Sequence, residues 1–169
     1  MSEALWAQRP APDAGAPLPV VWRAAPVALA ELTDLRGQLR AQLNDRLPER
    51  ARTEDAEWLL LAFEELASNG LRHGRPPVRV VVADTGRGWL LDVSDTAVEL
   101  PPTPAVGRDP ATGGLGLYMV ARLGAEHGWV VDGEGKHVWV RVDHATAADT
   151  TARRLPRPGR PCEEATGSD

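Results

Sequence analysis

Two apolar runs joined by a short turn limit the possible folds of this chain more than any other feature. The runs are residues 77–84 and 88–95, and the turn between them has the sequence DTGRG. Runs rich in β-branched and aromatic residues on either side of a few turn residues are typical of a β-hairpin. We therefore expect a hairpin with Asp84 at its turn and Asp95 at the end of its second strand.

Two segments with helical periodicity precede this hairpin. Residues 26–47 carry leucines three or four positions apart, and residues 49–74 place Leu59, Phe63 and Leu66 on one face. Gly74 is a typical residue just beyond a helix C-terminus. We expect two amphipathic helices, of which the second is the longer.

The other segments complete a mixed pattern of helices and strands. We expect a short strand at 20–24, a Pro/Gly-rich loop at 96–114, a third helix at 114–128 and a final hairpin from 129–133 and 136–143. This order predicts an α+β fold with helices on one face of a mixed, mainly antiparallel sheet.

Length and composition indicate one domain with two tails. The chain has 169 residues, enough for a single full core. Both ends are rich in Ala and Pro and lack periodicity, so residues 1–19 and 145–169 are expected to be flexible tails around a domain at 20–144.

Charge and hydropathy exclude several classes of partner. The 19 basic residues are scattered among 24 acidic ones, which argues against nucleic acid. The sequence has no apolar stretch long enough to span a membrane and no secretory signal pattern. The single cysteine fits a reducing compartment, so we expect a cytoplasmic protein.

Glu65, Asn69 and His73 recur every four residues on the second expected helix. Side chains at this spacing project along one side of a helix. An amide oxygen is a hard ligand for Mg²⁺, and a carboxylate can orient or deprotonate an attacking hydroxyl. The alternative interpretation is a solvated helix face.

Gly113, Gly114 and Gly116 lie at the start of the third expected helix. Glycines allow close approach of a phosphate, and a helix N-terminus favours anions. A simple loop hinge would have the same composition. The absence of a Gly-Lys-Ser/Thr ending excludes a P-loop, and a Rossmann fingerprint fits poorly because no acidic strand end follows at the right distance.

The two aspartates of the hairpin differ in their expected roles. Asp84 lies at the turn, where a carboxylate caps its own backbone. Asp95 lies where a strand leads into a long loop, and ligand groups concentrate at such exits. Asp95 is therefore the better candidate for a binding residue.

Taken in order, these motifs resemble those of the Bergerat ATP-binding fold of the GHKL superfamily. EELASNGLRHG resembles its N-box, VSDTA its Asp-x-Gly adenine box, and GGLGLYMV its second glycine box. The resemblance covers about residues 20–143 and implies a two-layer α/β sandwich, a histidine-kinase-like ATPase domain.

Carried over to this sequence, the resemblance implies that Glu65 is the general base and Asn69 the Mg²⁺ ligand. It assigns Asp95 to the adenine amino group, with Gly114 and Gly116 at a lid hinge beside the phosphates. Ala97 stands where the family usually has glycine. The implied nucleotide-binding residues are Asn69, Asp95, Ala97, Gly113, Gly114, Leu115, Gly116 and Leu117.

Within the superfamily, the small size and SNGLRHG are most similar to serine/threonine kinases that act as anti-sigma factors. This resemblance implies ATP and Mg²⁺ as cofactors, and a sigma factor or an anti-anti-sigma factor as protein partner. It also leaves open a homodimer formed through the first helix.

Two other functions are compatible with the same motifs. The chain could be a non-catalytic module in which ATP organises a surface for a sigma factor or another regulator. It could also be a stand-alone histidine-kinase-like catalytic domain, although none of its four histidines lies in a helical hairpin before the N-box.

The remaining aromatic and basic residues have simpler interpretations. We expect Trp22, Trp58, Trp89, Trp129 and Trp139 to lie in the core or an interface. Arg108 and Lys136 could contact phosphate, but loop charges of this kind are usually solvated.

Overall fold

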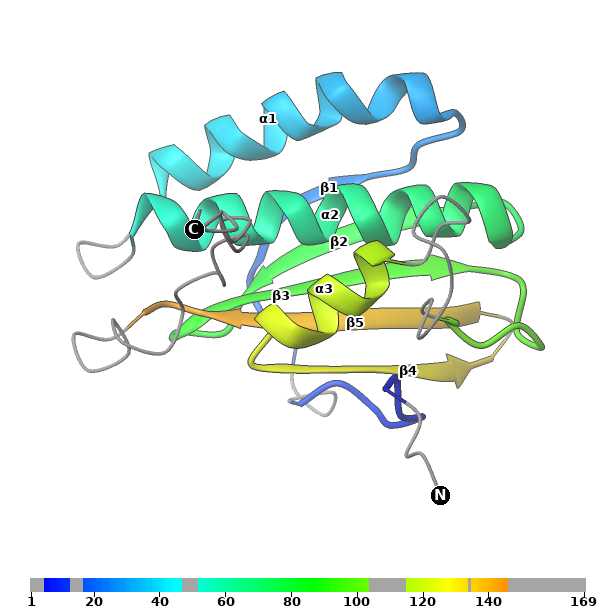
Figure 1. Cartoon of the computed structure of the whole chain (residues 1–169). Helices are drawn as coiled ribbons and strands as arrows, with labels where there is room; N and C mark the ends of the chain where they lie inside the picture. The colour runs from blue at the N-terminus through cyan, green and yellow to red at the C-terminus, as the bar shows by residue number, and fades with distance from the viewer. Residues whose placement is uncertain (1–4, 13–16, 47–51, 104–114, 134, 146–169) are drawn as a thin grey trace, which may run out of the picture.

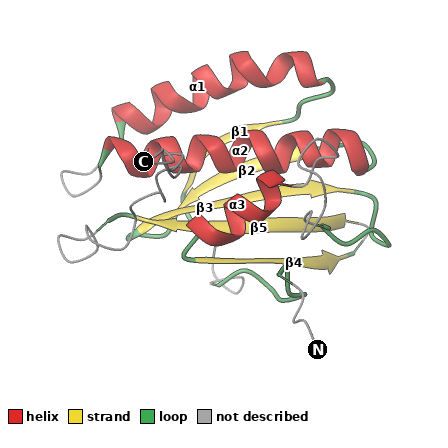
Figure 2. Cartoon of the chain, viewed as in Figure 1, coloured by secondary structure: helices red, strands yellow, loops and turns green. Residues whose placement is uncertain are grey.

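The residues that the structure describes form a five-stranded sheet with three α-helices packed on one face (Figure 1; Figure 2). The computed structural model describes residues 5–12, 17–46, 52–103, 115–133 and 135–145. The elements are β1 Val20–Ala24, η1 Leu29–Glu31 (a short 3-10 helix), α1 Leu32–Asp45, α2 Thr53–His73, β2 Arg79–Asp84, β3 Gly88–Asp95, α3 Leu115–Leu123, β4 Glu126–Asp132 and β5 Gly135–Asp143. This two-layer α+β arrangement confirms the expected fold class.

The sheet has the order β1-β2-β3-β5-β4, and each neighbouring pair of strands is antiparallel. The β2–β3 hairpin is confirmed. At its turn Gly86 has φ +77°, a conformation that favours glycine, and its N–H donates to Asp84 Oδ1 at 2.6 Å. Asp84 and Asp95 therefore lie at opposite ends of the hairpin.

Two helix boundaries differ from those expected. The first α-helix begins at Leu32, after η1, and not at Pro26. The third ends at Leu123 and not at residue 128, because β4 already pairs with β5 at Glu126. Gly124 marks this change, since a Cβ at that position would overlap the Val140 side chain.

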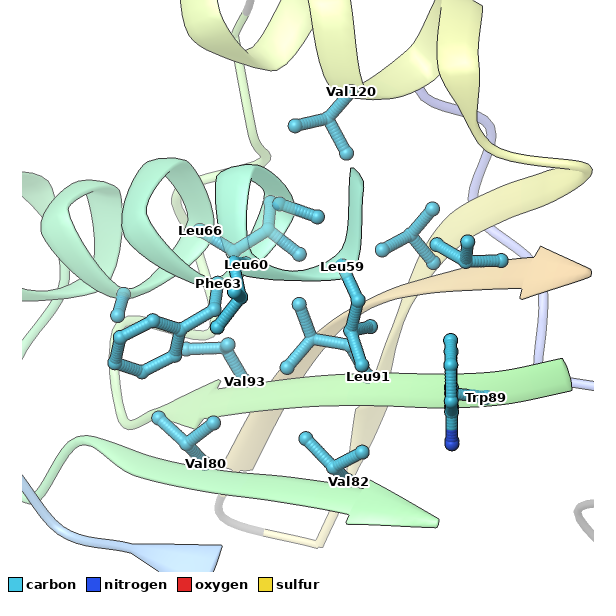
Figure 3. Packing of buried hydrophobic residues seen from close by; sticks show 14 of the residues in the cluster. Leu59, Leu60, Phe63, Leu66, Val80, Val82, Trp89, Leu91, Val93 and Val120 are labelled. Atoms are coloured by element: carbon cyan, nitrogen blue, oxygen red, sulfur yellow. The ribbon is translucent and has the colours of Figure 1, made fainter. Parts of the chain in front are cut away.

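The core lies between α2 and the sheet (Figure 3). Leu59, Phe63 and Leu66, the expected α2 stripe, are fully or almost fully buried. They face the inward side chains of β2 and β3, and α3 adds Val120. Among the tryptophans assigned to the core, three are buried and two pack against it at partial exposure: Trp22, Trp89 and Trp139, then Trp58 and Trp129.

Part of the expected N-terminal tail packs against the domain. Trp6 is 3% exposed, and its indole N–H donates to the Leu117 carbonyl at 3.2 Å. The backbone of this segment also bonds to β4, from Arg9 N to Trp129 O and from Trp129 N to Ala7 O. A single parallel bridge, Gln8 with Trp129, therefore joins this segment to the β4 edge of the sheet.

The other end of the chain is described as far as Ala145, whose N–H donates to Asp55 Oδ2 at 3.0 Å. The expected C-terminal tail otherwise lies outside the described residues. Within the part of the chain that is described, no helix is long and apolar enough to cross a membrane.

The packing of Trp6 yields a stability prediction. Trp6→Ala should lower the free energy of unfolding by about 3 kcal/mol, because it removes a large buried side chain and leaves a cavity. Urea denaturation measures this change. Gln8→Ala, an exposed change two residues away, is the control and should have little effect. A loss of unfolding free energy in Trp6→Ala as small as that in Gln8→Ala would show that the Trp6 side chain contributes no packing energy.

Candidate functional site

Helix α2 brings Glu65 to the beginning of α3. The Glu65 carboxylate lies directly against Gly116, where an added Cβ would overlap it. Glycine is therefore required at this position for the two helices to approach so closely. The first turn of a helix exposes unpaired N–H groups and the positive end of the dipole, which favours anions.

The environment of Glu65 makes its carboxyl group easier to protonate. Burial against α3 is the main cause that raises its pKa, the nearby Glu64 carboxylate raises it further, and Arg72 acts in the opposite direction. A carboxylate with a raised pKa is a better proton acceptor than an ordinary surface glutamate.

Asn69 follows Glu65 one turn later on the same helix and is half-buried. Within the described part of the chain, no group of three or more His, Cys, Asp or Glu side chains could hold a metal ion. An Mg²⁺ bound through Asn69 would thus need ligands from phosphate oxygens and water, as is usual for a metal bound with a nucleotide.

Asp95 lies beside the C-terminal end of the same helix. Gly74, which follows α2, abuts the Asp95 carboxylate so closely that a Cβ there would overlap it. Glu65 and Gly74 are separated by about 14 Å along the axis of a regular helix. Helix α2 therefore spans the distance between the two carboxylates predicted from the sequence.

The Asp95 carboxylate is buried, with 3% of the residue exposed, and each of its oxygens has partners. Oδ1 accepts the N–H of Ala97 at 2.7 Å and that of Arg75 at 3.4 Å. Oδ2 lies 3.1 Å from Nζ of Lys136, which is 2% exposed. Lys136 Nζ also donates to the Leu100 carbonyl at 2.9 Å, so one ammonium group joins Asp95 to the loop that follows β3.

The end of β3 is further bound to the segment after α2. Thr96 N donates to Arg75 O at 3.0 Å, and Thr96 Oγ1 donates to Pro76 O at 3.1 Å. Because the same segment donates an N–H to Asp95, the aspartate has a fixed position relative to α2.

Comparison with known proteins decides the family. A family model described as the histidine kinase-like ATPase domain matches residues 26–142. The chain belongs to this family. The assignment implies an ATP-binding domain and agrees with the Bergerat resemblance of the motifs.

A solved structure has the same fold. The crystal structure of the RsbU and RsbW domains of Rv1364c from Mycobacterium tuberculosis matches with a TM-score of 0.54 and 20% sequence identity. The match covers 76% of this chain and 33% of that one, so the present chain spans about a third of its length. No curated protein sequence matches significantly.

In this histidine kinase-like ATPase domain, the described site residues form two groups joined by α2. Glu65 lies with Gly116, and Asp95 lies with Ala97, whose methyl is fully buried. Within α3, Leu117 is on the buried side of the helix, while Leu115 is 45% exposed. Gly113, Gly114 and Arg108 lie outside the described residues. His73 is exposed at the end of α2.

Lys136 is the residue that the sequence interpretation missed. It is not a solvated loop charge, because it lies in β5 directly opposite Asp95 of β3. Its burial depends on the register between β3 and β5, for which the sequence around Lys136 carries no local signal.

The buried pair yields a second prediction. Lys136→Met should lower the free energy of unfolding by about 3 kcal/mol, because it leaves the Asp95 charge buried without its partner. The double variant Asp95→Asn/Lys136→Met should recover much of that loss. Urea denaturation measures both, with the exposed Arg23→Met as control. A single Lys136→Met variant as stable as the control would contradict the pairing.

Proposed function

We propose that this chain is an ATP-dependent serine/threonine protein kinase that acts as an anti-sigma factor in partner switching. The observation that carries the proposal is the half-buried Glu65 carboxylate, with its raised pKa, against the first turn of α3. The resemblance of SNGLRHG to anti-sigma kinases supports the choice of substrate class. A serine of a small anti-anti-sigma protein is the proposed phosphate acceptor.

In this proposal the nucleotide lies along α2, with adenine at Asp95 and the triphosphate at the first turn of α3. Asp95 accepts a hydrogen bond from the adenine amino group. The N–H groups and dipole of α3 stabilise phosphate charge. The buried ion pair with Lys136 supports this role because it holds the carboxylate in one orientation.

The residues of α2 fit a nucleotide bound with Mg²⁺. Asn69 supplies an amide oxygen one turn from Glu65, in a region where phosphate oxygens would complete the coordination. Held there, Mg²⁺ would neutralise part of the charge on the triphosphate.

Phosphotransfer then requires one proton acceptor from the protein. The serine oxygen forms a bond to the γ-phosphorus as the bond to the β,γ-bridging oxygen breaks, and ADP leaves. Glu65 accepts the hydroxyl proton. The protein otherwise contributes position and electrostatic stabilisation, which dominate catalysis of phosphoryl transfer.

Replacement of Glu65 separates a kinase from a binding module. Glu65→Gln should retain ATP binding but lower phosphotransfer by about a hundredfold or more, because it removes the proton acceptor. Transfer of radiolabelled phosphate from ATP to candidate anti-anti-sigma proteins measures activity, and calorimetry measures ATP binding. Glu57→Gln is the matched control on the same helix, since Glu57 pairs with Arg36 and Arg40 of α1 instead. A wild type that binds ATP but phosphorylates no candidate would favour the binding module.

The same assay predicts a pH dependence. The rate should fall as the pH drops through the Glu65 pKa, since a protonated carboxyl cannot accept a proton. This fall, the acid limb of the pH profile, should have its midpoint above the usual pKa range of glutamate. Glu64→Gln should move the limb to lower pH because it removes a charge that raises the pKa of Glu65. An acid limb unmoved by Glu64→Gln would contradict the assignment to Glu65.

A further inference from the structure

A set of direct bonds joins the segment before β1 to the domain. Residues 5–12, which we call the N-terminal strap, lie beside β4 (Figure 1). Arg9 N donates to Trp129 O at 2.8 Å, and Trp129 N donates to Ala7 O at 3.1 Å. The Arg9 guanidinium also donates to the His127 carbonyl at 2.7 and 2.9 Å. Backbone and side-chain bonds together therefore hold the strap against β4.

β4 and β5 have the residues that this contact needs. A Cβ at Gly128 of β4 would lie 2.9 Å from the Trp139 ring and 2.8 Å from the Arg9 side chain, too close for carbon atoms. Trp139 of β5 donates its indole N–H to the Arg9 carbonyl at 2.9 Å. The Arg9 guanidinium lies 5.4 Å from the centre of the same ring. The sheet edge is thus shaped to receive the strap.

Trp6 connects the strap to α3. Its side chain is 3% exposed and belongs to the same buried cluster as Leu117 and Val120 of α3. The indole N–H of Trp6 donates to the Leu117 carbonyl at 3.2 Å. On the β4 side, the His127 ring meets the Trp6 ring edge-on at 4.9 Å, and His127 Nε2 donates to the Leu5 carbonyl at 2.8 Å. Trp6 therefore joins α3 to the strand that holds the strap.

The helix held by Trp6 is also the helix at the proposed phosphate end of the site. Leu117 directly follows Gly116, and Gly116 lies against the Glu65 carboxylate. A helix of nine residues is short, and its backbone hydrogen bonds make it move as a unit. A displacement of Leu117 would therefore also displace Gly116 and the first-turn N–H groups relative to Glu65.

We propose that Trp6 is a positioning residue for the nucleotide, because it holds α3 where the first-turn N–H groups meet the phosphates. The N-terminal strap and the nucleotide are then coupled, and each stabilises the binding of the other by the same factor. This role rests on the proposed function only in that ATP binds with its phosphates at α3, and it requires no phosphotransfer. The strap precedes residues 26–142, which match the ATPase family.

A purely structural role of Trp6 would have a different effect on ATP. A substitution that only lowers the free energy of unfolding leaves the ATP affinity of the folded protein unchanged. The apparent affinity then falls only when a large fraction of the protein is unfolded. ATP affinity measured where every variant is fully folded therefore separates the two roles.

Trp6→Phe removes the indole N–H and keeps an aromatic ring. Calorimetry should show that this variant binds ATP with Mg²⁺ at least about fivefold more weakly than the wild type, the lower end of coupling between two sites. Trp22→Phe, the same change beside Phe63, is the control and should bind ATP with wild-type affinity. Circular dichroism verifies that both variants are folded.

The outcomes separate this role from the kinase proposal. Equal ATP affinity in folded Trp6→Phe and in the wild type would overturn the positioning role alone. An equal loss in Trp22→Phe would also overturn it, because the effect would then not depend on the strap. A wild type that binds ATP but transfers no phosphate would contradict only the kinase proposal, and one that binds no ATP would contradict both.

The reverse effect of ATP on the strap is a second test. Exchange of the Trp6 indole N–H with solvent requires its bond to Leu117 to open, and ATP should oppose this opening. NMR of the wild type should show this exchange at least about fivefold slower with saturating ATP than without it. The Thr85 N–H, which donates to Gly88 O at the β2–β3 turn, is the control and should be unaffected. An exchange rate of the Trp6 indole that ATP leaves unchanged would contradict the coupling.

Discussion

The Asp95–Lys136 ion pair is the interaction on which the proposed adenine end of the site depends. Both residues are almost completely buried, and their mutual attraction alone would not offset the loss of hydration. Additional hydrogen bonds from Ala97 and Arg75 to the carboxylate, and from the ammonium to Leu100, satisfy the remaining groups. The pair therefore joins β3, β5, the end of α2 and the loop after β3 at one point.

Helix α2 connects the Asp95 end of the candidate site to the Glu65 end. At each end a glycine allows a carboxylate to lie against the backbone, Gly116 for Glu65 and Gly74 for Asp95. Any side chain at these positions would push the carboxylate away. The apolar face of α2 is buried on the sheet, so the helix cannot rotate without loss of core packing. Rigid packing on one side thus fixes the polar groups on the other.

Local patterns were sufficient to predict the hairpin, the buried face of α2 and the α+β class. Glu65 and Asn69 could be selected because their spacing alone places them on one side of a helix. Lys136 was misassigned because its burial depends on strand register, which brings it opposite Asp95 across β3 and β5. Trp6 was missed because a single aromatic residue in an Ala/Pro-rich segment carries no periodic signal. The helix boundary at Leu123 was missed because long-range pairing of Glu126 with Arg141 overrides the local helical pattern.

The most direct test of the account is a nucleotide titration of the wild type, Asp95→Asn and Asp84→Asn. Asparagine preserves the size of each aspartate, so it perturbs the fold around Lys136 less than alanine would. We predict that ATP binds the wild type and Asp84→Asn with similar affinity, and Asp95→Asn at least about tenfold more weakly, because the hydrogen bond to adenine loses its charged acceptor. Equal losses in both variants, or full affinity in a folded Asp95→Asn, would contradict the assignment of Asp95 to adenine.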